Sequence, residues 1–233
     1  MNAVITGASR GIGKAVAQIF AAHGYNLFLC SKNEENLLPA IDEFQKDFPA
    51  ITVDGIAMDI SKKEQARLFG QWVLNKTDTV DVLVNNTGTY IPGNVSDEQD
   101  GALEQMLEVN LYSAYHTTRA VLPKMLAAKR GHIFTMCSIA SLDAYPGGGA
   151  YGISKYALLG FTRNLREELK QHGIKVTAVI PGAVYTASWN GSGVSEQRIM
   201  EAEDIAKMIF AASQLSPQAV VEDIVLRPQL GDL

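Results

Sequence analysis

Short runs rich in valine, isoleucine and leucine alternate along this chain with longer segments of helical period. Such alternation is typical of repeated strand–helix–strand units, in which the strands are parallel and belong to one sheet. We therefore expect a doubly wound α/β fold with seven parallel strands and helices on both faces of the sheet. The expected strands are 2–6, 26–31, 51–57, 80–85, 132–138, 175–180 and 220–226, and the expected helices are 11–23, 33–47, 62–75, 103–129, 150–172 and 202–213.

The 233 residues contain no internal repeat, low-complexity tract or proline-rich linker that would divide the chain. We expect a single domain over residues 1–233, because a sheet covered on both faces commonly fills this length. Two irregular segments follow expected strands at the carboxyl edge of the sheet, where open α/β folds bind their ligands. One is the glycine-rich stretch 146–149. The other, at about 183–200, is long enough to act as a lid over a substrate.

Charge and cysteine usage exclude several classes of function. The formal net charge is −5 and the lysines and arginines form no block, which argues against a nucleic-acid partner and a membrane-binding patch. No apolar run approaches the roughly 20 residues of a membrane span, and the segment after Met1 is too short for a signal peptide, so we expect a cytoplasmic protein. Cys30 and Cys137 form no Cys-x-x-Cys pair, and no cysteine–histidine cluster has metal-ligand spacing, so no metal is expected.

The first expected strand runs directly into the first expected helix through three glycines with the spacing G-x-x-x-G-x-G. Without β-carbons the chain can turn tightly and bring its N–H groups and the positive end of the helix against a pyrophosphate. This pattern predicts a Rossmann-type dinucleotide site, although an ordinary strand-to-helix turn is the alternative. The expected contacts in this glycine-rich turn are Thr6, Gly7, Ser9, Arg10, Gly11, Ile12 and Gly13.

The end of the second expected strand favours NADP(H) over NAD(H). An acidic residue at this point would bond the ribose hydroxyls and repel a 2′-phosphate, but the chain has no carboxylate here before Glu34. Ser31 offers a hydroxyl, and Lys32 and Arg10 offer positive charge to a phosphate. The alternative is that Lys32 and Arg10 are solvated surface residues, which leaves NAD(H) open.

A tyrosine and a lysine four residues apart, Tyr151 and Lys155, begin a helical stretch and therefore share one helical face. This spacing alone is common, so its context matters. Ser138 ends an expected strand shortly before it, Asn110 lies in the preceding helical stretch, and Asn85-Asn86-Thr87-Gly88 ends the fourth expected strand.

Taken in order, the glycine-rich turn, Asp59, Asn85-Asn86-x-Gly88, Asn110, Ser138, Tyr151-x-x-x-Lys155 and Pro181-Gly182 resemble the short-chain dehydrogenase/reductase family along essentially the whole chain. This resemblance implies that Tyr151 is the catalytic acid/base and that Ser138 orients the substrate oxygen. Lys155 would hold the nicotinamide ribose and favour the phenolate. Asn110 would support a proton relay through water.

The same resemblance implies further cofactor contacts. Asp59 would contact the adenine, the segment at Asn86 would lie behind the cofactor, and Thr186 would contact the nicotinamide amide. Ile60, Thr87, Gly88, Pro181, Gly182, Val184, Tyr151 and Lys155 complete the implied set. The chain departs from the family pattern at Thr87, where most members have alanine, and at Cys137, where serine is common. Neither departure removes a group assigned to catalysis.

The chemistry is sensible without the family name. Hydride delivery to a carbonyl carbon leaves negative charge on oxygen, which a tyrosine can protonate and a serine hydroxyl can stabilise. We therefore expect an NADP(H)-dependent oxidoreductase of a small carbonyl or alcohol substrate. Residues 181–186 and 221–228 look similar to bacterial sepiapterin-reductase-like members, which suggests pteridine or small diketone substrates.

Two other functions stay open. Reduction of 3-oxoacyl chains on acyl carrier protein would need a basic docking patch, for which Lys124, Lys129 and Arg130 are scattered candidates. A dinucleotide-binding sensor or scaffold without turnover is the alternative from another class, but a degenerate member would normally lose Tyr151, Lys155 or Ser138. The resemblance also implies self-association through the helices that begin near Leu103 and Ala150, as a homodimer or homotetramer.

Overall fold

A computed structural model describes residues 1–189, 191 and 193–233 of the chain. Its centre is one seven-stranded parallel sheet in the order β3-β2-β1-β4-β5-β6-β7. The strands are β1 (Asn2–Thr6), β2 (Asn26–Ser31), β3 (Val53–Ala57), β4 (Val82–Asn85), β5 (Gly131–Met136), β6 (Ile174–Pro181) and β7 (Asp223–Leu226). The doubly wound parallel sheet expected from the alternating pattern is confirmed.

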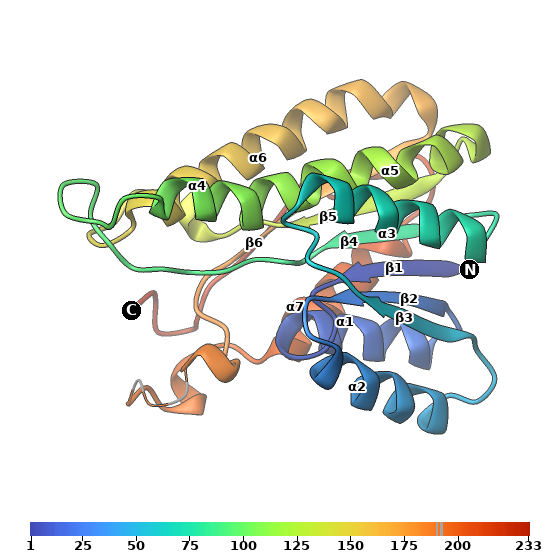
Figure 1. Ribbon diagram of the computed structural model, residues 1–233, viewed down its shortest axis with the longest axis horizontal. Coiled ribbons are helices and arrows are strands. Elements are labelled where there is room, and N and C mark those ends of the chain that lie inside the picture. The colour runs from blue at the N-terminus through green and yellow to red at the C-terminus, as the bar shows by residue number, and fades with distance from the viewer. Residues whose placement is uncertain (190, 192) are drawn as a thin grey trace.

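Helices cover both faces of the sheet, as Figure 1 shows: α1, α2 and α7 lie on one side, and α3, α5 and α6 on the other. The helices are α1 (Gly11–Ala22), α2 (Glu34–Asp47), α3 (Lys63–Lys76), α4 (Ala102–Met106), α5 (Ser113–Ala128), α6 (Gly149–Leu169) and α7 (Ala202–Ser213). A π-helical segment, Leu107–Tyr112, joins α4 to α5. Short 3₁₀ turns occupy Ile139–Ser141, Lys170–His172, Ala187–Trp189 and Glu196–Arg198.

Each face of the sheet has its own apolar core. On one face, Phe20 of α1 and Phe44 of α2 are fully buried. On the other face, Phe69 of α3 and Met125 of α5 are fully buried. Because both faces are covered, the central strands read as near-continuous apolar runs. Burying one such side chain contributes about 1.5–3 kcal/mol, so the two cores hold the sheet as a rigid platform.

The direction in which successive strands are added to the sheet changes between β1 and β4. The chain moves outward from β1 to β3 on one side and then returns to β4 on the other, so the connections diverge at this point. Ligands of open α/β sheets bind at such a switch point, outside the carboxyl ends of the strands. At this edge of Figure 1 lie the segment after β4, the start of α6, the segment after β6 and the carboxyl terminus.

Several expected elements differ from the observed ones at their ends. The expected strand 51–57 begins at Val53, because a turn in which the Ile51 N–H bonds to Phe48 O precedes it. The expected strand 132–138 spans Gly131–Met136, because Ser138 instead caps a 3₁₀ turn. The strands expected at 80–85 and 220–226 begin at Val82 and Asp223.

The expected single α-helix over 103–129 is wrong in its middle. The chain follows a π-helical path over Leu107–Tyr112, so α4 and α5 are separate α-helical segments of one longer helix. A π-helical segment within a helix widens one turn, and such segments are frequent at functional sites. Here it carries Asn110, whose side chain is completely buried.

Candidate active site

The glycine-rich turn between β1 and α1 is shaped by Gly7, Gly11 and Gly13. Gly7 and Gly11 have φ of +63° and +54°, and a β-carbon at Gly13 would overlap the Gly7 carbonyl oxygen. Helix α1 begins at Gly11, and the side chain of its N-cap residue, Arg10, makes no capping bond. The first N–H groups of α1 therefore face the turn without a side-chain acceptor from the N-cap, as anion-binding helix ends do.

Asn86 fixes the shape of this turn from the neighbouring strand. Its Nδ2 donates to Thr6 O and to Gly7 O, both at 3.1 Å. In return, Thr6 Oγ1 accepts from the backbone N–H of Asn86 at 3.0 Å and of Thr87 at 3.1 Å. The expected phosphate contacts and the expected contacts after β4 are thus brought together by direct hydrogen bonds.

The end of β2 lies beside this turn. Ser31 Oγ accepts from the Ser9 N–H at 3.1 Å, which ties the second strand to the loop that precedes α1. Lys32 Nζ lies 2.8 Å from Asp59 Oδ2, and Asp59 Oδ1 accepts from Ser61 Oγ at 2.6 Å. Burial alone would raise the pKa of Asp59, but the bonds from Lys32 and Ser61 outweigh it and lower that pKa overall. The positive charge of Lys32 is therefore paired with the Asp59 carboxylate next to the glycine-rich turn.

Lys155 and Tyr151 lie together on α6. Lys155 is only 4% exposed, and its Nζ donates to Met136 O at 2.8 Å and lies 5.7 Å from the centroid of the Tyr151 ring. The segment after β4 passes close to Asn110 at Gly88, where a β-carbon would lie 3.3 Å from Asn110 Oδ1. A buried ammonium held at the end of β5 is a fixed positive charge beside the phenol.

Asn110 joins the segment after β4 to α6. Its Oδ1 accepts from the Thr89 N–H at 2.7 Å, and its Nδ2 donates to Thr89 O at 3.1 Å and to Ser154 Oγ at 2.9 Å. Ser154 Oγ donates in turn to Tyr151 O at 2.7 Å. Sequence reasoning missed Thr89 and Ser154, whose short polar side chains carry no signal beyond their position next to the motifs.

Ser138 lies just beyond the carboxyl end of β5 and is buried. Its Oγ accepts from the Ala140 N–H at 3.2 Å, while the Ser138 N–H bonds to Ser141 Oγ at 3.2 Å. This mutual capping fixes the direction of the hydroxyl and leaves its hydrogen to donate. Ser138, Tyr151, Lys155 and Asn110 thus come from neighbouring elements at one edge of the sheet: the 3₁₀ turn after β5, helix α6 and the π-helical segment.

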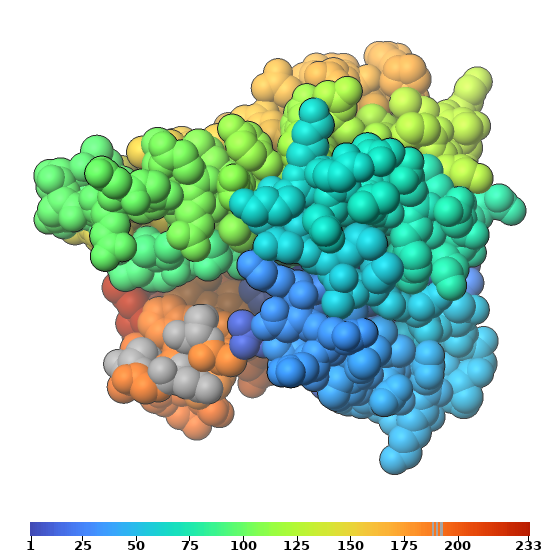
Figure 2. Space-filling model, in the orientation of Figure 1, coloured from blue at the N-terminus to red at the C-terminus, as the bar shows by residue number. Residues whose placement is uncertain are grey.

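The segment after β6 lies across the glycine-rich turn. A β-carbon on Gly11 would lie 3.1 Å from Thr186 Cγ2, so Thr186 sits directly against the start of α1. The base of the segment is closed by backbone bonds from the Tyr185 N–H to Met200 O at 2.8 Å and from the Met200 N–H to Ala183 O at 3.1 Å. Asn190 and Ser192, which belong to the lid expected at 183–200, lie outside the described residues. Figure 2 shows the molecule hollowed between this orange segment and the green segment after β4.

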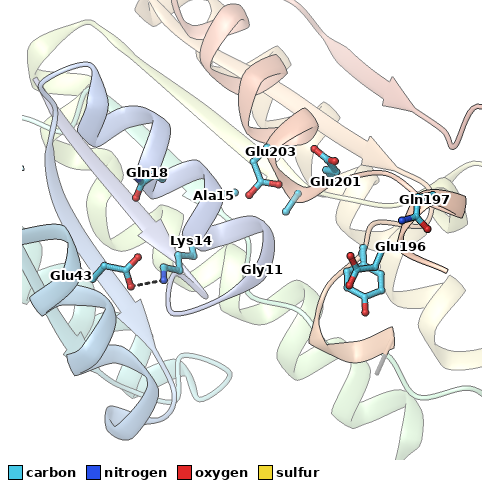
Figure 3. A pocket seen from close by; sticks show the side chains of 11 residues that line it. Gly11, Lys14, Ala15, Gln18, Glu43, Glu196, Gln197, Glu201 and Glu203 are labelled. Atoms are coloured by element: carbon cyan, nitrogen blue, oxygen red, sulfur yellow. Dashed lines mark hydrogen bonds and ion pairs between the residues drawn. The ribbon is translucent and has the colours of Figure 1, made fainter. Parts of the chain in front are cut away.

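A cavity of about 570 Å³ opens on the outer side of the glycine-rich turn, apart from Tyr151. Figure 3 shows Lys14 and Glu43 facing each other on one side, 2.7 Å apart, with Glu196 and Gln197 on the other. Glu201 and Glu203 extend the acidic lining. The one lysine of this lining is paired with Glu43, so the surface does not suit a phosphate. Of the predicted cofactor contacts only Gly11 lines this cavity, so the cavity is largely separate from the predicted cofactor site.

Among the described residues, no group of three or more His, Cys, Asp or Glu side chains is arranged to hold a metal ion. No helix in this part of the chain is long and apolar enough to cross a membrane.

Comparison with known proteins identifies the family. The model of the short chain dehydrogenase family matches residues 1–196, so this chain belongs to that family. An uncharacterized oxidoreductase of Staphylococcus saprophyticus is 30% identical over 226 residues, which are 97% of this chain and 96% of that protein. The resemblance stated from the motifs is confirmed, and the protein is an oxidoreductase.

Solved structures agree in fold. An alcohol dehydrogenase of the archaeon Thermococcus sibiricus, complexed with 5-hydroxy-NADP, superposes with a TM-score of 0.90 at 29% identity, covering 98% of this chain and 96% of that one. A metagenomic short-chain oxidoreductase in complex with NADP gives 0.85 at 31% identity, covering 98% and 97%. L-sorbose reductase from Gluconobacter frateurii, complexed with NADPH and L-sorbose, gives 0.89 at 25% identity, covering 97% and 94%.

Proposed function

We propose that this oxidoreductase transfers a hydride between NADP(H) and a small carbonyl or alcohol substrate, with Tyr151 as the general acid and base. The observation that carries the proposal is the buried Lys155 ammonium, held by Met136 O at 2.8 Å and 5.7 Å from the Tyr151 ring. When bound, the dinucleotide supplies or accepts the hydride. The side chains of this protein would handle the accompanying proton and the charge on oxygen.

Tyr151 is the proposed proton donor in the reducing direction. As negative charge develops on the carbonyl oxygen, the Tyr151 hydroxyl gives up its proton to it, and the phenolate left behind is stabilised by the neighbouring Lys155 ammonium. In the oxidising direction the same phenolate accepts the proton of the alcohol. A fixed charge in a largely buried site needs no rearrangement during the reaction, which is why it stabilises the transition state well.

Ser138 and Asn110 take supporting roles in this proposal. Ser138 has its Oγ fixed by the bond from the Ala140 N–H and so can aim its hydrogen at the substrate oxygen. Asn110 holds Thr89 and Ser154, and through them it sets the spacing between the segment after β4 and the first turn of α6. We retain the proton relay through water implied for Asn110 by the family resemblance as part of the proposal.

The residues at the nucleotide end fit NADP(H). The glycine-rich turn forms a cradle that a β-carbon at Gly13 would fill, and Ser31 and Lys32 lie beside it with Arg10 at the start of α1. Lys32 pairs with Asp59, so a 2′-phosphate would have to share or replace this ion pair. Structures similar to this chain were solved with NADP or NADPH, which supports the same preference here.

The range of substrates that we propose is narrower than the range of carbonyl and alcohol compounds named above. Pteridines and small diketones remain the suggested substrates, from the sequence similarity to sepiapterin-reductase-like members. The acyl-carrier-protein alternative loses support, because Lys124 pairs with Asp78 and Arg130 with Asp81, close to the amino end of β5 and away from Tyr151. We further propose a homodimer or homotetramer and a reducing, cytoplasmic location, which the two buried free cysteines fit.

The experiment that tests the proposal is a titration of the protein with NADPH and NADH, followed by turnover of sepiapterin, diacetyl and an acetoacetyl thioester. We expect a strong preference for NADPH and turnover of one substrate class. Tyr151→Phe should lower kcat by at least about 100-fold while the Kd for NADPH changes less than about 2-fold. Tyr156→Phe removes a hydroxyl on the same helix, one that donates to Leu142 O, and is the matched control.

Two results would contradict this reading. If Tyr151→Phe retains most of the activity, the assigned acid/base is wrong. If the protein binds NADPH tightly but turns over none of a broad carbonyl panel, the sensor function gains support.

A further inference from the structure

Two tyrosines besides Tyr151 lie at the proposed catalytic site. Tyr90 follows β4, and its ring meets the Tyr151 ring edge to face, with 4.9 Å between centroids and an angle of 85° between planes. Tyr145 lies in the segment just before α6. Both remain open to solvent beside the site, at 52% exposure for Tyr90 and 40% for Tyr145.

The two tyrosines interact with each other as well as with Tyr151. Burial raises the pKa of Tyr145 well above its usual range, and a hydrogen bond with Tyr90 and the proximity of Tyr90 and Tyr151 raise it further. Tyr145 therefore stays protonated over the working pH range and keeps an O–H group that can donate. Three phenols thus share one small region, and one of them is the proposed acid/base.

The segments that carry Tyr90 and Tyr145 are locked together. The Gly93 N–H bonds to Gly147 O at 3.1 Å, and the Gly147 N–H bonds to Asn94 Oδ1 at 2.9 Å. Glu98 Oε2 accepts from the Ala150 N–H at 3.0 Å, in the first turn of α6, where a carboxylate is favoured by the helix dipole. The aromatic surface is consequently formed before any ligand arrives.

Half-exposed tyrosines that line a reactive site have a specific use. Each offers a flat apolar ring for stacking and a hydroxyl that stays in contact with water or with a polar ligand group. Ligand sites combine such aromatic walls with a few fixed polar groups, which here are Ser138 and Tyr151. A short aliphatic chain would leave most of this aromatic surface uncovered, whereas a flat ring would cover it.

We propose that Tyr90 and Tyr145 form the wall that binds the substrate next to its reacting carbonyl, and that the substrate carries a flat unsaturated or aromatic ring beside that carbonyl. This inference rests on the proposed function, because it takes Tyr151 as the reacting group. It adds two specificity-determining residues and a substrate class to that proposal.

The test compares two diketones that differ only in one group. Acetylbenzoyl has a phenyl ring where diacetyl has a methyl group. Binding of each to the protein saturated with NADP⁺, which cannot reduce them, is measured by calorimetry. We expect the wild-type protein to bind acetylbenzoyl at least about 10-fold more tightly than diacetyl, and Tyr90→Ala to abolish most of this preference. A 10-fold change corresponds to about 1.4 kcal/mol.

Matched variants separate the ring from general effects. Tyr90→Leu keeps a side chain of similar bulk without an aromatic face and should lose the preference as Tyr90→Ala does, so it serves if the alanine variant folds poorly. Tyr145→Phe keeps the aromatic ring and should therefore keep the preference for acetylbenzoyl. Because it removes a hydroxyl that can donate a hydrogen bond, it should weaken the binding of both diketones. Tyr112→Ala changes a comparably exposed tyrosine elsewhere on the surface and should change nothing. Circular dichroism and the Kd for NADPH verify that each variant is folded.

The outcomes separate this inference from the proposed function. Equal binding of the two diketones by the wild-type protein, or a preference unchanged in Tyr90→Ala and Tyr90→Leu, overturns the wall. Turnover of either diketone with NADPH is scored independently. A preference that depends on Tyr90 without any turnover supports the wall and counts against Tyr151 as the acid/base. Turnover without such a preference supports Tyr151 and refutes the wall.

Discussion

The buried His132 predicts that this protein loses stability in mild acid. His132 lies on β5 with 4% exposure, its Nε2 is 2.7 Å from Thr177 Oγ1, and its ring stacks on Phe134 at 3.9 Å between centroids. Its Nδ1 has no hydrogen-bond partner among the residues that the structure describes. Burial, with a smaller effect of the nearby Lys175, lowers the pKa of His132 from its usual 6.5 to about 3.

The sign and size of the effect follow from proton linkage. Between pH 6.5 and about 3 the unfolded chain binds a proton at His132 while the folded protein does not, so stability falls as the pH falls through this window. Each pH unit below 6.5 costs about 1.4 kcal/mol. At pH 5 the loss is therefore about 2 kcal/mol, from 1.5 units, and a typical domain has only about 5–15 kcal/mol of stability in total.

Urea unfolding of the wild-type protein and of His132→Gln, at pH 7.5 and pH 5 and at one fixed protein concentration, measures this loss. Other groups titrate in the same range, so the relevant quantity is the difference between the two proteins. We expect the wild-type free energy of unfolding to fall by about 2 kcal/mol more than that of the variant. His172→Gln, at an exposed position, should behave like the wild type. An equal fall in the wild type and His132→Gln would refute the reasoning.

Two further predictions concern the nucleotide site. Gly13→Ala should weaken NADPH binding at least about 100-fold, measured by cofactor fluorescence, because its β-carbon would overlap Gly7 O. Gly160→Ala, at a helical glycine with nothing within 4 Å, is the control and should leave binding unchanged; equal binding by both variants would contradict the cradle. Lys32→Ala should weaken NADPH binding about 10-fold and NADH binding little, since only the former carries the extra phosphate. A parallel loss for both cofactors would argue that Lys32 acts only through Asp59.

Local sequence signals were sufficient to predict the fold and to single out the residues that the structure brings together at the candidate site. The alternation of apolar runs and helical segments predicted the sheet, because each strand of a parallel sheet is buried on both faces. The glycine-rich turn and the Tyr151–Lys155 spacing were readable for a similar reason. The glycines of the turn are close together in the chain, and Tyr151 and Lys155 are one helical turn apart, so both patterns can be recognised from neighbouring residues.

The features that the sequence did not reveal depend on distant contacts. The π-helical segment Leu107–Tyr112 is only 6 residues long, too short for a change of apolar period to show in the sequence. The Asn110 side chain that it carries bonds to Thr89 and Ser154 across the fold. The Lys32–Asp59 pair joins two different strand ends. Tyr90 and Tyr145 are far apart in the chain, and the loops that carry them are joined through the backbone bond between Gly93 and Gly147.

The bonds from Asn86 to the glycine-rich turn have a consequence for the kinetics of cofactor exchange. Because Nδ2 of Asn86 already holds Thr6 O and Gly7 O, the cradle does not have to be ordered by the incoming nucleotide. We therefore expect little conformational entropy to be lost at this end of the proposed site on binding. Thr186 lies against the same turn, so we expect the segment that carries it, part of the lid predicted at 183–200, to limit the rate of cofactor exchange.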